Sequence, residues 1–284
     1  MDRRPTLPLV LLLIGLSLAS ENYSKTNETD DPSITSMILN ANKLTNEMLH
    51  QGDILVHKSR NAMKCPEKNN RCLWKKSANG LVNVPYVISS EYSSDQVKTI
   101  TAAMQSFADK TCIRFVPRNQ QTAYIQIENR GGCFSIVGSV GDKQTVSLAD
   151  FACLRHGIIQ HELLHALGFY HEHTRSDRDK YVRINWSYIA KSDMDNFRME
   201  DTNNLGTPYD YGSVMHYDKY AFTTDMAKET ITPIPDESVK IGQRKEMSDI
   251  DVARVNKLYQ CKNANNVRTE GERWAMHEGR RDIP

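Results

Sequence analysis

The sequence has almost no net charge, no long hydrophobic run after its first twenty residues and no internal repeat. Its 36 basic and 35 acidic residues nearly cancel, so the composition predicts neither a nucleic-acid nor a membrane partner. No later run approaches the ~20 apolar residues that a transmembrane helix needs. No C-x-x-C pair occurs, which argues against a zinc ribbon built from thiolates. With 39% hydrophobic residues, the chain can nevertheless form a buried core.

Residues 1–20 predict a secretory signal. They have a basic start, an apolar stretch from Leu7 to Leu18 and small residues at the end, so cleavage after Ala19 or Ser20 fits. The alternative is an N-terminal anchor, but the apolar stretch is too short to span a bilayer as a stable helix. We therefore expect a secreted, extracellular protein, with secretory granules as one route.

Secretion determines how the cysteines are interpreted. In an oxidising compartment an even number of cysteines favours disulfides over metal thiolates. Spacing alone does not choose among the fifteen pairings that six cysteines allow. The six are Cys65, Cys72, Cys112, Cys133, Cys153 and Cys261. Three sequons, at Asn22, Asn27 and Asn185, are candidate glycan acceptors whose occupancy the sequence leaves open.

The distribution of cysteines divides the remaining chain. Residues 21–60 contain none, open with an acidic stretch and end in Lys58-Ser59-Arg60, a site for a trypsin-like protease. They predict a propeptide, and we call them the propeptide segment. A disulfide-bonded domain over residues 61–261 and a polar, flexible tail over 262–284 are expected to follow. Apolar spacing at Met37, Ile38, Leu44 and Met48 indicates one modest helix in the propeptide segment.

Local patterns predict a mixture of strands and helices in the first half of the domain. Ser93 and Gln96 form a capping box that opens a helix with a stripe of apolar residues. The expected strands are 84–89, 113–116 and 124–128, with another extended piece at 135–140. A helix is expected from Leu154 to Leu167, ending at Gly168, and one more from Ser248 to Tyr259. After about residue 172 the pattern is mostly irregular.

The segment His161-Glu-Leu-Leu-His-Ala-Leu-Gly-Phe-Tyr-His171 carries the chemistry. Two histidines four residues apart lie on one face of a helix, so His161 and His165 can bind the same metal ion. Gly168 allows a sharp turn, after which His171 can return as the third ligand. Three neutral imidazoles suit a catalytic zinc ion with an open position. The alternative is a histidine-rich amphipathic helix without metal, but the extended pattern disfavours it.

Glu162 stands next to the first ligand, where its carboxylate can take a proton from an activated water. It can then pass that proton to the leaving amine, acting as general base and then as general acid. A second segment, Ser213-Val-Met-His-Tyr217, follows Gly212. By themselves Met215 and Tyr217 would be ordinary core residues. Together with the histidine helix, Met215 fits the methionine turn of metzincins, and Tyr217 is a plausible hydroxyl donor.

These residues resemble the astacin family of zinc metalloproteases. The matching runs are 161–175, 177–184 and 213–217, and the resemblance covers roughly residues 50–261. It implies an α+β metzincin fold with two subdomains around a cleft, the first with a twisted sheet and two helices, the second irregular. It also implies that Tyr217 is a further zinc ligand whose hydroxyl can swing to stabilise the oxyanion.

The resemblance also implies two regulatory residues. Gln51-Gly-Asp-Ile54 is similar to the motif of astacin precursors whose aspartate binds zinc, which makes Asp53 the latency switch. The alternative for Asp53 is an exposed loop carboxylate. Glu172 resembles the family glutamate that contacts the mature N-terminus after activation. Without the resemblance, Glu172 would be a surface carboxylate.

The cysteines extend the resemblance. The family implies the pairs Cys112–Cys261 and Cys133–Cys153, which leaves Cys65 with Cys72. That extra pair resembles six-cysteine fish astacins, which include hatching enzymes. The charge run Arg175, Asp177, Arg178 and Asp179 is interpreted as a solvated or ion-paired structural turn, with no part in catalysis.

The sequence therefore predicts a secreted zinc endopeptidase, made as a latent precursor, that binds one zinc ion and acts as a monomer. Its partners would be an activating trypsin-like protease and protein substrates, with egg-envelope glycoproteins implied by the resemblance. Two alternatives stay open. One is a processing or immune-tissue protease of the same family, and the other is a secreted binding protein with a vestigial zinc site.

Overall fold

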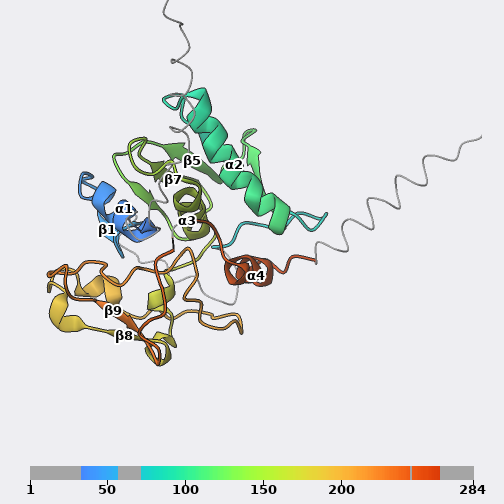
Figure 1. Ribbon diagram of the computed structural model, residues 1–284. Coiled ribbons are helices and arrows are strands. Elements are labelled where there is room, and N and C mark those ends of the chain that lie inside the picture. Colours follow the sequence, from blue (N-terminus) through green and yellow to red (C-terminus); the bar gives the residue numbers. More distant parts are fainter. Residues whose placement is uncertain (1–32, 57–71, 244, 263–284) are drawn as a thin grey trace, which may run out of the picture. The chain divides into compact units, whose positions relative to one another are not determined.

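The computed structural model describes residues 33–56, 72–243 and 245–262 (Figure 1). Its α-helices are α1 (Ile34–Asn42), α2 (Ser94–Lys110), α3 (His156–Ala166) and α4 (Asp249–Leu258). Its strands are β1 (Leu49–His50), β2 (Ile54–Leu55), β3 (Val82–Ile88), β4 (Ile113–Pro117), β5 (Tyr124–Glu128), β6 (Cys133–Ser135), β7 (Lys143–Leu148), β8 (Val182–Ile184) and β9 (Ile231–Pro233). Short 3₁₀ helices span Glu172–Thr174, Arg178–Lys180, Trp186–Tyr188 and Met194–Phe197. In these ranges no helix is long and apolar enough to cross a membrane.

A seven-stranded sheet has the order β1-β2-β6-β7-β5-β3-β4. Strands β4, β3, β5 and β7 run parallel, whereas β6 is antiparallel to β7. Helix α2 packs on α3 and β4, and α3 packs on β6 and β7 (Figure 1). Strand β2 of the propeptide segment extends the sheet by pairing parallel to β6, with Ile54 opposite Ser135. The propeptide segment therefore occupies one edge of the sheet.

The strands expected at 84–89, 113–116 and 124–128 correspond to β3, β4 and β5, so these predictions are confirmed. The extended piece expected at 135–140 is wrong in extent. The structure instead has β6 at Cys133–Ser135 and β7 at Lys143–Leu148. Strand β7 is polar in sequence yet buried, because Gln144 Nε2 donates to the Gly138 carbonyl at 2.7 Å and Ser147 Oγ to the Gly132 carbonyl at 2.7 Å.

Helix α2 begins as its capping box predicts. Ser93 Oγ accepts a hydrogen bond from the backbone N–H of Gln96 at 3.3 Å, and the side-chain Oε1 of Gln96 accepts one from the backbone N–H of Ser93 at 2.7 Å. These two bonds satisfy two backbone donors that the first turn leaves unpaired. The predicted apolar stripe faces the core, where Ile100 and Phe107 are fully buried.

Helix α3 starts two residues later than expected and lies inside the larger hydrophobic core. All its residues from Gly157 to Ala166 are buried. Gly168 then adopts a positive φ of 104°, a conformation that glycine adopts without steric cost. The reversal returns the chain toward the helix at His171.

The second half of the described chain is largely irregular, as expected, and forms a core of its own. That second core contains buried residues from β8, β9 and the intervening segments, namely Val182, Ile184, Ile189, Phe197, Tyr209, Tyr217, Ala221 and Ile231. The antiparallel pair β8–β9 was not predicted, because strands of three residues are too short to show a period. Helix α4 agrees with the helix expected over 248–259.

Two disulfides lie in the described ranges. Cys112–Cys261 joins the residue before β4 to the segment that follows α4, across a sequence separation of 149. Cys133–Cys153 joins β6 to the segment before α3, across 20 residues. Both are the pairs that the family resemblance implied.

The helix of the propeptide segment is shorter than its apolar spacing indicated. Helix α1 ends at Asn42, and Leu44 and Met48 are 71% and 73% exposed. Only the first part of the pattern packs on the domain, through the buried residues Ile34 and Ile38. The prediction that the helix reaches Met48 is therefore wrong.

Several predictions fall outside the described residues. These are the signal at 1–20, the sequons at Asn22 and Asn27, the cleavage site 58–60, the start of the disulfide-bonded domain at residue 61, Cys65 with its pairing to Cys72, and the tail after Lys262. The domain boundaries stay predictions.

Candidate metal centre

Helix α3 presents two histidines one turn apart. The Nδ1 atom of His161 lies 2.9 Å from the carbonyl oxygen of Val214, and that of His165 lies 2.7 Å from the carbonyl oxygen of Phe169. A carbonyl only accepts hydrogen bonds, so each Nδ1 carries the proton and each Nε2 keeps its lone pair. Both Nε2 atoms are therefore ready to bind a cation.

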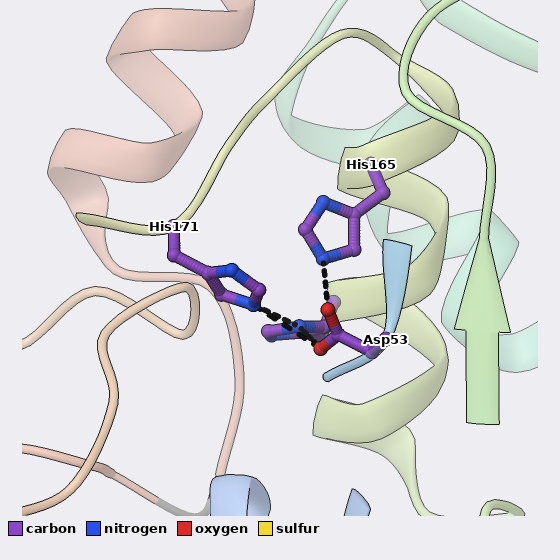
Figure 2. A group of neighbouring side chains, drawn as sticks. Asp53, His165 and His171 are labelled. Carbon is purple, nitrogen blue, oxygen red and sulfur yellow. Dashed lines mark hydrogen bonds and ion pairs between the residues drawn. The ribbon is translucent and has the colours of Figure 1, made fainter. Parts of the chain in front are cut away.

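His171 and Asp53 complete a group of four buried ligands. One donor atom each from His161, His165, His171 and Asp53 lies within 4.8 Å of the others. Figure 2 shows the Asp53 carboxylate pointing at the ring nitrogens of His165 and His171. The three histidines, which are 108 or more residues after Asp53 in the sequence, thus lie next to this aspartate of the propeptide segment in the fold.

The Asp53 carboxylate lies close to all three imidazoles. Its Oδ2 is 3.0 Å from His161 Nε2 and 3.1 Å from His171 Nε2, and its Oδ1 is 3.4 Å from His165 Nε2. Asp53 is only 2% exposed, so the alternative of an exposed loop carboxylate is excluded. Asp53 Oδ1 and His165 Nε2 are buried without a hydrogen-bond partner, a cost that a cation at this point would remove.

The protonation states also suit a metal ion. Burial lowers the pKa of His165, and it lowers the pKa of His171 to about 3, so both rings are neutral near pH 7. Burial opposes ionisation of Asp53, but the positive charge that His171 and His165 carry when protonated holds the pKa of Asp53 well below its ordinary value. Three imidazoles and one carboxylate are ligands of the number and type that zinc takes. The four side chains fit a zinc ion.

Comparisons with known proteins agree with this site. A model of the peptidase family described as "Astacin" matches residues 67–260. The low choriolytic enzyme of Oryzias latipes is 55% identical over 263 residues, which cover 89% of this chain and 97% of that protein. High choriolytic enzyme 1 of the same fish is 52% identical, over 81% of this chain and 84% of the relative.

The chain belongs to the astacin family. The solved structure of high choriolytic enzyme 1, described as a hatching enzyme zinc-protease, has a TM-score of 0.68 and 53% identity, and it covers 71% of this chain and 100% of that structure. The predicted family, α+β metzincin fold and zinc endopeptidase activity, with one zinc site, are thereby confirmed.

Glu162 of this astacin lies beside the ligands but outside the four-residue group. Both of its carboxylate oxygens are buried without a hydrogen-bond partner. Burial raises the pKa of Glu162 well above its ordinary value, and the nearby charge of Asp53 raises it further. A carboxyl group in such surroundings is suited to exchange a proton, which is the role predicted from its place in the sequence.

The Tyr217 hydroxyl is engaged by the propeptide segment. It donates a hydrogen bond to the backbone carbonyl of Gln51, while its ring stacks on His173 with centroids 3.8 Å apart. Its centroid is 4.6 Å from that of His171, so the tyrosine borders the metal centre. Its predicted role as a zinc ligand stays a prediction.

The segment around Met215 supports the first histidine. Met215 is buried in the larger core, and the preceding carbonyl, that of Val214, holds His161. Asp251 of α4 fixes this segment by accepting from Ser213 Oγ at 2.6 Å and from the Val214 amide at 2.9 Å. The sequence analysis did not identify Asp251 as a residue that supports the site. The signal that could have found it is its place three residues after Ser248, where it completes the capping box of α4.

Glu172 is a buried residue, 2% exposed, and not the surface carboxylate of the alternative interpretation. Arg254 donates to both of its carboxylate oxygens, and the Asp210 amide donates to Oε1 at 2.7 Å. Its predicted contact with the mature N-terminus stays a prediction.

The charge run that follows is ion-paired and structural. The Arg175 guanidinium pairs with Asp177 at 2.9 Å and donates to the Pro208 carbonyl at 3.0 Å. Arg178 is buried, pairs with Asp179 and donates to the His173 and Phe197 carbonyls. These contacts brace the loops around the third histidine, and none of these residues belongs to the group of four ligands.

Proposed function

We propose that this astacin is made as a latent precursor and that the processed enzyme hydrolyses proteins of the egg envelope. The observation that carries latency is the buried carboxylate of Asp53 among the Nε2 atoms of three histidines. The support for the substrate is the set of relatives, whose printed names describe choriolytic enzymes and a hatching enzyme. In the precursor Asp53 would occupy the position at which water and substrate must bind.

The proposed order of segments follows the sequence. Residues 1–20 direct secretion, 21–60 form the propeptide, 61–261 form the catalytic domain and 262–284 form a tail. A trypsin-like protease cuts after Arg60 and removes Asp53 together with α1, β1 and β2. Disulfides such as Cys133–Cys153 are typical of an oxidising, extracellular environment. The processed enzyme acts as a monomer after release, with secretory granules as the route.

In the processed enzyme His161, His165 and His171 would hold zinc, with Tyr217 as a further ligand. When bound, zinc activates water and polarises the peptide carbonyl. Glu162 takes the proton from the attacking water and later gives it to the leaving amine. The Tyr217 hydroxyl, free of the Gln51 carbonyl once the propeptide has left, donates to the carbonyl oxygen as negative charge develops there.

The test is to incubate the processed enzyme with purified egg envelope and, in parallel, with casein. We expect soluble fragments from both, loss of both activities with a chelator, and recovery when zinc is restored. Cleavage of casein with an intact envelope would reject the substrate but keep the endopeptidase. An enzyme that cleaves neither substrate, with zinc present, would reject the proposed mechanism as a whole.

A further inference from the structure

Gln51, which immediately precedes the Gly52-Asp53 pair, is held in an unusual way for a polar residue of a connecting turn. It is fully buried, with 0% of its surface exposed. Its φ is 50°, in the left-handed region that residues with a Cβ rarely adopt. Surrounding contacts must therefore hold the backbone of Gln51 in this strained conformation.

The side-chain amide of Gln51 bridges Glu200 and the third histidine. Its Nε2 donates to Glu200 Oε1 at 2.9 Å, and its Oε1 lies 2.8 Å from His171 Nδ1. Because a carboxylate only accepts, Glu200 fixes which end of the amide faces it. The amide oxygen must then face His171, and His171 Nδ1 must carry the proton. The lone pair of His171 therefore resides on Nε2, the atom that faces the metal centre.

The partner of His171 differs in origin from those of the other two histidines. His161 and His165 donate from Nδ1 to the carbonyls of Val214 and Phe169, which belong to the expected catalytic domain. His171 donates to a side chain of the propeptide segment. Cleavage after Arg60 would remove that side chain and leave the other two hydrogen bonds in place.

We propose that Gln51 is a positioning residue for the zinc site of the precursor, which fixes the tautomer and orientation of His171 until the propeptide is removed. The precursor then holds zinc more tightly than it would with Asp53 alone. This inference rests on the zinc site and on the propeptide removal proposed above. Loss of a hydrogen bond to a ligating histidine typically weakens metal binding by about 10- to 100-fold.

The substitution Gln51→Met tests this, because it removes the amide and keeps the side-chain length. The other contacts of this turn stay available, since Tyr217 bonds to the residue-51 backbone carbonyl and His50 Nε2 lies 3.0 Å from Glu200 Oε1. Zinc-loaded full-length precursors are mixed with a chromogenic chelator and the rate of zinc transfer is followed. We expect transfer from the Gln51→Met precursor to be about 10 to 100 times faster than from the parent.

Control variants separate the effect of the Gln51 side-chain amide from other effects of substitution. Asn40→Ala removes an exposed amide of the propeptide segment whose contact is with Lys43, and it should leave the transfer rate unchanged. Glu200→Leu, which removes the carboxylate acceptor and leaves Gln51 Nε2 with only His50 Nε2 at 3.2 Å, should speed transfer from the precursor several-fold. Enzymes processed from the parent and from Gln51→Met have the same sequence and should release zinc at the same rate. In cobalt-substituted precursor, the visible absorption band should shift in Gln51→Met and not in Asn40→Ala.

Transfer from the Gln51→Met precursor within twofold of the parent, or equal acceleration in Asn40→Ala, would overturn the proposal. An unshifted cobalt band would also overturn it, since a merely structural role leaves the geometry at the ion unchanged. A precursor that binds no zinc overturns both this inference and the proposed function. If the intact Asp53→Ala precursor has no peptidase activity while Gln51→Met still speeds zinc transfer to the chelator, only the latency proposal fails.

Discussion

At the residue scale, two of the three histidines of the metal centre depend on partners that lie outside the histidine segment His161–His171. His161 and His171 donate from Nδ1 to acceptors outside the histidine segment, the Val214 carbonyl and the Gln51 side chain, whereas His165 donates to the Phe169 carbonyl within it. Glu162 differs from these ligands because the structure gives its carboxylate no partner. A buried carboxyl group without a partner is costly, and this cost is consistent with a role in proton transfer.

The substitution Glu162→Gln tests that role, because it keeps the size of the side chain and removes its ability to take a proton. We expect the processed variant to retain one zinc ion and to lose activity on a fluorogenic peptide by about 100- to 10,000-fold. Metal analysis and peptide hydrolysis are measured on the same preparation. A variant with full zinc content and undiminished hydrolysis would show that another group is the base.

At the element scale, helix α4 acts as a clamp on the segment that carries Met215. Asp251 is 3% exposed and accepts from Ser213 Oγ, the Val214 amide and the Ser248 amide, the last at 3.0 Å. One side chain therefore caps its own helix and holds the loop whose carbonyl orients His161. The metal centre thus depends on an element that is remote in sequence from the histidine helix.

Asp251→Ala should destabilise the protein by about 3 kcal/mol or more, because two buried donors, Ser213 Oγ and the Val214 amide, and the part-buried Ser248 amide lose their acceptor. Asp249→Ala is the matched control, since Asp249 is exposed on the first turn of the same helix. Its loss should cost less than about 1 kcal/mol, through the helix dipole alone. Urea unfolding of the parent and both variants measures the difference. Equal midpoints for the two variants would contradict the assignment of Asp251 as the clamp.

At the scale of the whole molecule, a disulfide closes a large part of the chain into a loop. Cys112 and Cys261 are separated by 149 residues, and the loop between them includes the zinc-binding histidines and both strands of the second sheet. Closing a loop removes conformational entropy from the unfolded chain, and a longer loop removes more. This disulfide therefore favours the folded chain without touching the metal centre.

Replacing Cys112 and Cys261 together by alanine should lower the free energy of unfolding by about 5 kcal/mol on the loop-entropy model. The same model gives about 3 kcal/mol for Cys133–Cys153, whose separation is 20 residues, so that double variant is the comparison. Urea unfolding under non-reducing conditions gives both values. An unfolding midpoint for the Cys112/Cys261 variant equal to that of the parent would contradict this account.

The order of residues by itself determined the zinc motif, the family and most of the regular elements. The spacing of His161, His165 and His171 is local, because a helix and one glycine turn are enough to bring these residues together. The capping boxes of α2 and α4 are likewise local, since each joins a residue to the third one after it. Such features form between residues that are close in the chain, so they can be predicted from the sequence alone.

Only the tertiary structure decided the features that depend on distant partners. Strand β7 is polar in sequence and still buried, because Thr145 bonds to Glu128 and Ser147 to the Gly132 carbonyl. The Gln51 side chain bridges two residues that lie 149 and 120 positions further along the chain, Glu200 and His171. No local pattern records such contacts, because burial of a polar group becomes favourable only when the fold supplies its partner.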